Sequence, residues 1–195
     1  MDKSFCIFGD SVTQAAYVKA GWTELLKQYL EKKYQNNFIN FFNLGIGGNT
    51  TSDVLKRFEI EASFRTPTSI IFNVGINDSG YFKEITKSII KKTNFKTNLE
   101  KIISKAKAHT KDITFIGLCL GDDSILKPPP GNTDGKCFDK KRMEAYDKLL
   151  ENIARKNSCR FIKIWENLND QDFLDGLHPN DQGHQKMFQV ISKYF

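Results

Sequence analysis

Phe5-Cys6-Ile7-Phe8, followed at once by Gly9-Asp10-Ser11, is a short apolar run that ends in small and polar residues. A run of this length that is apolar on both faces is typical of a strand in a parallel sheet covered by helices. Four further runs of this kind follow, at residues 38–42, 69–74, 113–118 and 161–164. The pattern therefore predicts five strands, each followed by a break in the apolar sequence.

Longer stretches between these runs carry apolar residues at spacings of three and four, the period of an amphipathic helix. These stretches fall at residues 22–30, 54–62, 95–106, 143–153 and 187–194. We interpret each as core packing rather than as part of a cofactor site. Strands that alternate with helices predict an α/β sandwich with right-handed crossovers and helices on both faces of the sheet.

Two segments, at about 79–93 and 119–138, show neither period and are expected to be irregular. The second contains Pro128-Pro129-Pro130-Gly131, which excludes both a helix and a strand ladder there. Irregular segments of this length inside a domain are often functional.

Composition indicates a globular chain. The 195 residues are 39% hydrophobic and 27% charged, which suits a single domain, 1–195, with a full core. No apolar run approaches the roughly 18 residues of a membrane helix, and the apolar stretch near the N-terminus is too short for a signal peptide. We therefore expect no membrane span and a cytoplasmic location.

Charge and cysteine content narrow the class further. The net charge of +6 comes from lysines spread over helix faces, and only five of the basic residues are Arg, so we expect a solvated surface and no nucleic-acid partner. The four cysteines include no C-x-x-C pair and no zinc-ligand spacing to a histidine. Cys6 lies in an apolar strand pattern, where a buried, reduced thiol is the usual state, and a reducing compartment fits.

Small and polar residues follow four of the five predicted strands. They are Gly9-Asp10-Ser11, the segment 43–50, Gly75-Ile76-Asn77-Asp78, and Asp175-Gly176-Leu177-His178-Pro179 before the last helix. In open α/β sheets, ligands bind beyond the carboxyl ends of the strands, where the strand order reverses. We therefore expect these four segments to meet at one edge of the sheet and to form the functional site.

A nucleophile and its base are candidates within these segments. Ser11 has a hydroxyl that becomes reactive when a neighbouring base removes its proton, and the His178 imidazole is the type of base that works near neutral pH. Asp175 lies three residues before His178 and can orient its second ring nitrogen. The alternatives are structural: Ser11 as a helix N-cap, Asp175 as a turn residue and His178 as a surface side chain.

An oxyanion hole is also within reach of these segments. The Asn77 amide and the backbone N–H groups of Ser11 and Gly45 are donors of the kind that bind the negative oxygen of a tetrahedral intermediate. The alternatives are an Asx-turn at Asn77 and loop flexibility at the glycines, and the G-x-G-G spacing matches no phosphate-binding motif.

Other polar residues receive structural interpretations. Asp10 is expected to brace the loop that carries Ser11. We expect His109 to be a polar residue near a helix C-terminus and His184 to be exposed. The residues Asp10, Asp78, Asp122 and Asp123 have the chemistry to bind a hard cation but show no EF-hand spacing.

The four blocks, in this order, resemble the SGNH (GDSL-type) hydrolase family, whose block residues are Ser, Gly, Asn and His. They correspond here to Ser11, Gly45, Asn77 and His178, so the resemblance spans nearly the whole chain. Val12 stands where the family name implies Leu. The G-x-S-x-G elbow of the α/β-hydrolase fold is absent.

This resemblance implies a flavodoxin-like, three-layer α/β/α sandwich with a five-stranded parallel sheet. It implies an esterase, lipase, thioesterase or deacetylase that uses no metal and no cofactor and acts on a small-molecule acyl ester. Ser11 would be the nucleophile, His178 the base and Asp175 its orienting acid. Ser11 and Gly45 would give backbone N–H groups to the oxyanion hole, and Asn77 its side-chain amide.

Two other functions stay open at this point. One is a flavin or nucleotide carrier on the same fold, with residues 9–13 as its phosphate loop. The other is a metal-dependent phosphoesterase that uses Asp10, Asp78, Asp175 and His178. Polar residues near Asp122 hint at a polar leaving group, whereas the oligomeric state is open.

Overall fold

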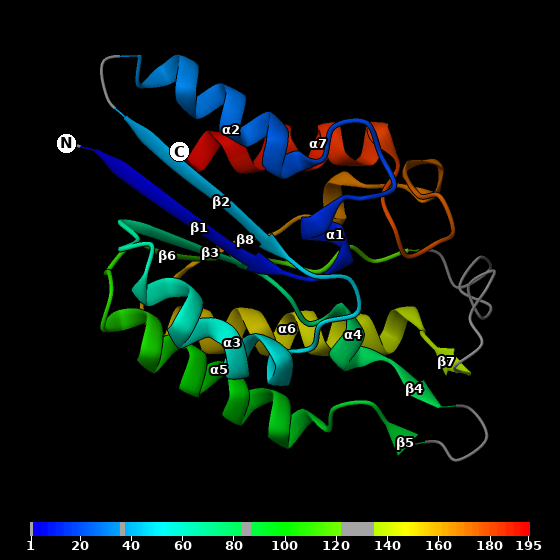
Figure 1. Ribbon diagram of the computed structural model, residues 1–195. Coiled ribbons are helices and arrows are strands. Elements are labelled where there is room, and N and C mark those ends of the chain that lie inside the picture. The colour runs from blue at the N-terminus through cyan, green and yellow to red at the C-terminus, as the bar shows by residue number, and fades with distance from the viewer. Residues whose placement is uncertain (1, 36–37, 83–86, 122–134) are drawn as a thin grey trace.

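A five-stranded parallel sheet forms the centre of the molecule in the computed structural model, which describes residues 2–35, 38–82, 87–121 and 135–195 (Figure 1). Its strand order is β2-β1-β3-β6-β8. The strands are β1 (Lys3–Gly9), β2 (Ile39–Gly45), β3 (Ser69–Asn73), β6 (Ile113–Ile116) and β8 (Arg160–Ile162). The five predicted strands and their parallel arrangement are thus confirmed.

Helices cover both faces of this sheet, as predicted. One face packs against α2 (Trp22–Lys33) and α7 (Asp181–Ile191), and the other against α3 (Thr51–Ser63), α5 (Lys92–Lys107) and α6 (Lys140–Lys156) (Figure 1). The apolar stripes supply the two cores: Leu26 and Met187 are buried on the first face, and Phe58 and Leu150 on the second. The last predicted stripe is too long, because α7 ends at Ile191 and Tyr194 is 49% exposed in a following 3₁₀ turn.

The strand order reverses beside β1, and this places the site. From β1 the chain moves to β2 on one side, and it then crosses back to β3 on the other side of β1. The register aligns Gly9 with both Gly45 and Asn73, so the three strands end level with one another. The loops that follow them consequently leave the sheet at the same edge.

A second, small antiparallel sheet was not predicted. It has the order β5-β4-β7 and consists of β4 (Tyr81–Phe82), β5 (Lys87–Ser88) and β7 (Lys136–Cys137). Strands of two residues are too short to show a period in the sequence, so the segments were expected to be irregular. Residues 122–134, with Asp122, Asp123 and the proline run, lie outside the described residues.

All four cysteines are buried and unpaired, as expected for Cys6. Burial raises the pKa of the Cys6 thiol to about 12, although the nearby Arg65 lowers it, and a protonated thiol of this kind behaves as a small apolar side chain. Among the described helices, none combines the length and the apolar character needed to cross a membrane.

Candidate active site

Ser11 begins a four-residue helix directly after β1. This helix, α1 (Ser11–Gln14), is capped by Asp10, whose Oδ1 accepts the Val12 N–H at 3.0 Å. Asp10 therefore braces the turn, as predicted, and it occupies the N-cap position that was the structural alternative for Ser11. Gly9 is required just before it, because a Cβ there would lie 2.0 Å from Thr13 Oγ1. The strand end and α1 are thereby held in close contact.

Ser11, His178 and Asp175 lie in one hydrogen-bonded chain. Ser11 Oγ is 2.9 Å from His178 Nε2, and His178 Nδ1 is 2.7 Å from Asp175 Oδ2. The Ser11 and His178 positions are separated by 167 residues in sequence, so the fold alone brings them together. The contact between these three side chains is the arrangement predicted from the four blocks.

The proton positions in this chain follow from Asp175. Burial alone would raise the pKa of Asp175, but hydrogen bonds from the His178 ring and backbone N–H outweigh it and lower the pKa to about 2. An ionised Asp175 can only accept, so Nδ1 of a neutral His178 carries the proton. Nε2 is then left unprotonated and can accept the Ser11 hydroxyl proton.

A compact turn holds Asp175 and His178 in position. Asp175 Oδ1 accepts the backbone N–H groups of Leu177 at 3.0 Å and of His178 at 2.8 Å. Gly176 adopts a positive φ of 80°, which favours glycine. Leu174 N–H donates to His178 O at 2.8 Å, which closes the turn. Asp175 is therefore a turn residue and the His178 partner at once, so the two interpretations do not compete.

Asn77 lies in the short helix α4 (Ile76–Ser79), which follows β3. Its Nδ2 donates one hydrogen bond to Asn49 O at 3.1 Å. An amide nitrogen carries two N–H groups, so a second donor remains. Asn77 is half-buried, and its second amide N–H has no partner among the described residues.

The loop after β2 presents its glycines differently from what was predicted. The Gly45 N–H donates to Asn43 Oδ1 at 3.0 Å, and the Gly47 N–H donates to Gln14 Oε1 at 3.0 Å. Gly48 is exposed, has a positive φ of 78°, and its N–H has no partner among the described residues. A Cβ added to Gly47 would lie 3.9 Å from Ser11 Cβ, so this turn is beside the nucleophile.

Arg57 on α3 connects these loops, a role that was not predicted from the sequence. Its guanidinium donates to Gly9 O at 3.3 Å, to Leu44 O at 2.7 Å and to Asn49 Oδ1 at 2.9 Å. It also pairs with Glu61 at 2.6 Å. Arg57 thus ties the ends of β1 and β2 to the residue that holds Asn77. A lone Arg in an amphipathic helix carries no sequence signal for this role.

Asp78 is a second long-range anchor. Both of its carboxylate oxygens accept hydrogen bonds from Thr51, which opens α3. Burial raises the pKa of Asp78 to about 6, although the Thr51 hydrogen bonds oppose this. Asp10 is also completely enclosed, and burial raises its pKa to about 7. The described residues contain no group of three His, Cys, Asp or Glu side chains arranged to hold a metal ion.

The remaining histidines differ from each other. His109 follows the end of α5 and is 3.3 Å from Glu59, as suits a polar residue there. His184 was predicted to be exposed, and this was wrong: it is 2% exposed, and its Nδ1 accepts the Trp22 N–H at 3.2 Å. Burial lowers the pKa of His184 to about 4. It faces the start of α2 rather than solvent because α7 packs its histidine side against that helix.

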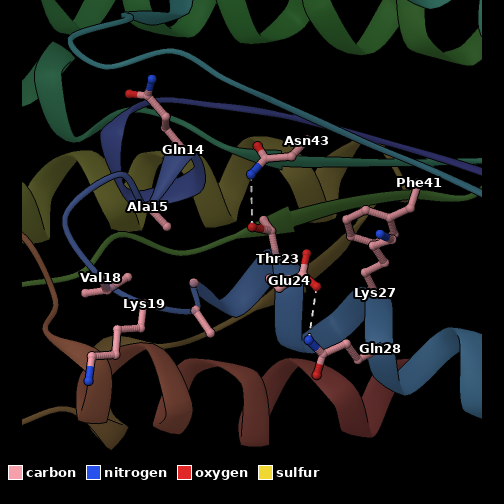
Figure 2. Close-up of a pocket in the computed structure, with 12 residues that line it drawn as sticks. Gln14, Ala15, Val18, Lys19, Thr23, Glu24, Lys27, Gln28, Phe41 and Asn43 are labelled. Carbon is pink, nitrogen blue, oxygen red and sulfur yellow. Dashed lines mark hydrogen bonds between the residues drawn. The ribbon is translucent and has the colours of Figure 1, made fainter.

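A polar groove of about 660 Å³ lies on the β2 side of α1 (Figure 2). Neither Ser11 nor His178 lines it, so the groove is separate from the hydrogen-bonded chain. Gln14 is the link, because it lines the groove and accepts the Gly47 N–H beside Ser11. The groove is lined by Gln14, Ala15, Val18, Lys19, Ala20, Gly21, Thr23, Glu24, Lys27, Gln28, Phe41 and Asn43.

Comparison with known proteins shows the family of this chain. Residues 7–186 match the model of the GDSL-like lipase/acylhydrolase family. The chain therefore belongs to this family, a class of serine hydrolases that act on ester bonds.

Individual relatives are more distant. The chain is 30% identical over 109 residues to an uncharacterized lipoprotein of Bacillus subtilis (strain 168), YqeF, and the match covers 52% of this chain and 42% of that protein. It thus spans less than half the length of that curated relative.

Solved structures share the fold over almost the full length. Axe2, an acetylxylan esterase from Geobacillus stearothermophilus, has a TM-score of 0.76 at 18% identity, with 98% of this chain and 94% of that chain covered. TesA has a TM-score of 0.74 at 18% identity, with 97% of this chain and 96% of that chain covered.

Proposed function

We propose that the protein hydrolyses small-molecule acyl esters through a triad of Ser11, His178 and Asp175. The observation that carries this proposal is the unbroken chain of contacts, 2.9 Å from Ser11 Oγ to His178 Nε2 and 2.7 Å from Nδ1 to Asp175. A flavin or nucleotide carrier would have no need of this arrangement. In Axe2, a serine and a histidine are each the site of a catalytic mutant.

In the first half-reaction, Ser11 Oγ attacks the acyl carbonyl carbon while His178 Nε2 takes the hydroxyl proton. The carbonyl oxygen becomes an oxyanion. When the tetrahedral intermediate collapses, the bond to the leaving alcohol breaks and His178 returns the proton to that alcohol. Asp175 stays ionised throughout and stabilises the charged imidazolium between these two transfers.

In the second half-reaction, water attacks the acyl-enzyme. His178 takes a proton from the water as its oxygen bonds to the acyl carbon. The bond to Ser11 Oγ then breaks, the proton returns to Ser11, and the carboxylic acid leaves. The two half-reactions need only the ester, water and the protein's own residues.

The oxyanion is bound, in this proposal, by the Ser11 N–H, the second N–H of the Asn77 amide, and a glycine N–H from the loop after β2. Gly45 was the sequence prediction for this glycine. We propose Gly48 in its place, because the Gly45 N–H is engaged by Asn43 whereas the Gly48 N–H has no partner in the described parts of the chain. Hydrogen-bond donors that are already oriented need little reorganisation when negative charge develops on the carbonyl oxygen.

Ser11→Ala tests the proposal. Hydrolysis of p-nitrophenyl acetate should fall by on the order of 10⁶-fold, the scale of nucleophile removal in serine hydrolases. The urea midpoint should be unchanged, because a small loop side chain contributes little core energy. Ser63→Ala is the matched control, since Ser63 is exposed on α3. Persisting ester hydrolysis in Ser11→Ala, or chelator-sensitive hydrolysis of p-nitrophenyl phosphate instead, would contradict the proposal.

A cytoplasmic location is part of the proposal. It is supported by the four unpaired, buried cysteines, which suit a reducing compartment. Fractionation of the native cells tests it: the protein should be in the cytosolic fraction, whereas recovery with membranes would place it alongside its lipoprotein relative.

A further inference from the structure

The aromatic ring of Tyr17 lies next to His178 and is largely exposed to solvent. The ring is 61% exposed, and its centroid is 4.8 Å from the imidazole centroid at an interplanar angle of 49°. The ring adds nothing to either hydrophobic core. An aromatic side chain that contacts a reactive imidazole and is mostly open to solvent has free area for a ligand.

The loop that carries Tyr17, residues 15–21, is anchored at both ends. Ala15 takes the left-handed conformation at φ 55° and donates to Ser11 O at 2.8 Å. Lys19 N–H donates to Asp181 Oδ1 at 3.1 Å, and the Trp22 N–H that follows the loop donates to His184. Tyr17 does not line the polar groove, although its loop neighbours Ala15 and Val18 do. Its ring points to His178 instead.

The direction of proton transfer makes this side of His178 the leaving-group side. His178 delivers its proton from Nε2 to the leaving oxygen, so that oxygen lies beside the imidazole when the bond breaks. The oxyanion donors Asn77 and Gly48 come from other loops, after β3 and β2. A group attached to the leaving oxygen lies on the His178 side of the site, where the Tyr17 ring contacts the imidazole.

We propose that Tyr17 is a specificity-determining residue that forms a leaving-group subsite for a sugar ring. This inference rests on the proposed esterase function and names the class of alcohol that the reaction releases. One face of a sugar ring presents C–H bonds, which pack on the electron-rich face of an aromatic ring. Its hydroxyl groups then point outward, towards solvent.

The surroundings of Tyr17 favour a sugar over a fatty alcohol. Ala16 and Lys19 on the same loop are exposed, and so is Asp181, whose carboxylate accepts the Lys19 N–H. A long alkyl chain would need a continuous apolar surface to recover its hydrophobic free energy. A sugar ring has one apolar face, and the tyrosine ring alone is large enough to pack against it.

Two acetates with different alcohols test this subsite. Glucose pentaacetate and ethyl acetate share the acyl group, so the acyl and oxyanion sides of the site are the same for both. Tyr17→Ala should raise KM for the sugar ester by about three- to tenfold, the effect of one aromatic contact. Ethyl acetate kinetics should stay within about twofold, because its alcohol is too small to cover the ring.

Further variants separate the effect of the aromatic ring from the effect of side-chain volume. Tyr17→Phe should keep the sugar preference and Tyr17→Leu should lose it, since stacking needs the ring and not the volume. Tyr194→Ala removes a similarly exposed tyrosine in the C-terminal turn and should leave the kinetics with both esters unchanged.

An equal loss on both esters would overturn the inference and make Tyr17 a support for His178, and unchanged kinetics would overturn it as well. Ester hydrolysis that survives Ser11→Ala would instead overturn the proposed function, and this inference with it.

Discussion

The two sides of the active site are held in place by different means. The His178 side is local: Asp175 binds the ring and the backbone of a residue three positions later, within one turn. The Asn77 side is long-range: Asn77 reaches Asn49 across 28 positions, and Arg57 reaches Gly9 across 48. In the proposed mechanism, proton transfer therefore depends on a short motif, whereas oxyanion binding depends on the packing of α3 against the loops after β1, β2 and β3.

Removing the local partner should have the largest effect. Asp175→Asn should lower kcat by about 10⁴-fold, as the corresponding change does in serine proteases, because the imidazole tautomer is no longer imposed. The fold should persist. Steady-state kinetics measure the loss, and Asp170→Asn on the preceding 3₁₀ turn is the control, since Asp170 is exposed. A loss of only a few-fold would mean that Asp175 is a turn residue and does not orient His178.

Removing the long-range donor should have a smaller and different effect. Asn77→Ala should lower kcat by about 10²- to 10³-fold, with KM nearly unchanged because the donor acts mainly in the transition state. Asn94→Ala is a control, because Asn94 is an exposed residue on α5. If KM alone rose, Asn77 would bind substrate in the ground state instead.

Breaking the long-range anchor should lower both stability and activity. Arg57→Ala leaves three neutral acceptors and the Glu61 carboxylate without their charged donor and should reduce the free energy of unfolding by about 3 kcal/mol. Glu61→Gln removes only the i, i+4 pair and should cost less than about 1 kcal/mol. Urea denaturation measures both changes. Equal effects of the two substitutions would mean that Arg57 acts through Glu61 alone and not through the loops.

His184 tests another long-range contact by pH. Its pKa is about 4 in the folded protein, below the ordinary value of about 6.5, so the unfolded chain binds the proton more tightly. Stability is then lost as pH falls from about 6.5 towards 4, by roughly 2 kcal/mol at pH 5. His184→Gln keeps an acceptor for the Trp22 N–H. Its free energy of unfolding should therefore change less with pH across this window. Parallel stability curves for the two proteins would contradict this assignment.

The sequence predicted the local features well. Apolar runs and helical stripes located all five strands of the main sheet and the long helices, because burial on both faces of a sheet or on one face of a helix leaves a periodic pattern. The Ser11 and His178 segments were found for a related reason. Each follows a strand or precedes a helix, and the Asp175 spacing is contained in one turn.

Features that depend on distant partners could not be predicted in this way. Arg57 looks like any charged residue on α3, and its role exists only when β1 and β2 end beside that helix. His184 was misplaced because a polar side chain in an amphipathic helix is usually exposed, whereas here it accepts the Trp22 N–H at the start of the neighbouring helix α2. The engagement of the Gly45 N–H by Asn43 was not predicted either, although Asn43 lies only two residues away.

Covalent labelling is the direct test of Ser11 as the nucleophile that His178 activates. A fluorophosphonate probe should label the folded protein once, and mass spectrometry of the digested protein should locate the adduct on Ser11. Ser11→Ala should show no labelling, and Asp175→Asn should label slowly at the same serine. Labelling that persists in Ser11→Ala, or an adduct on any other residue, would contradict the account.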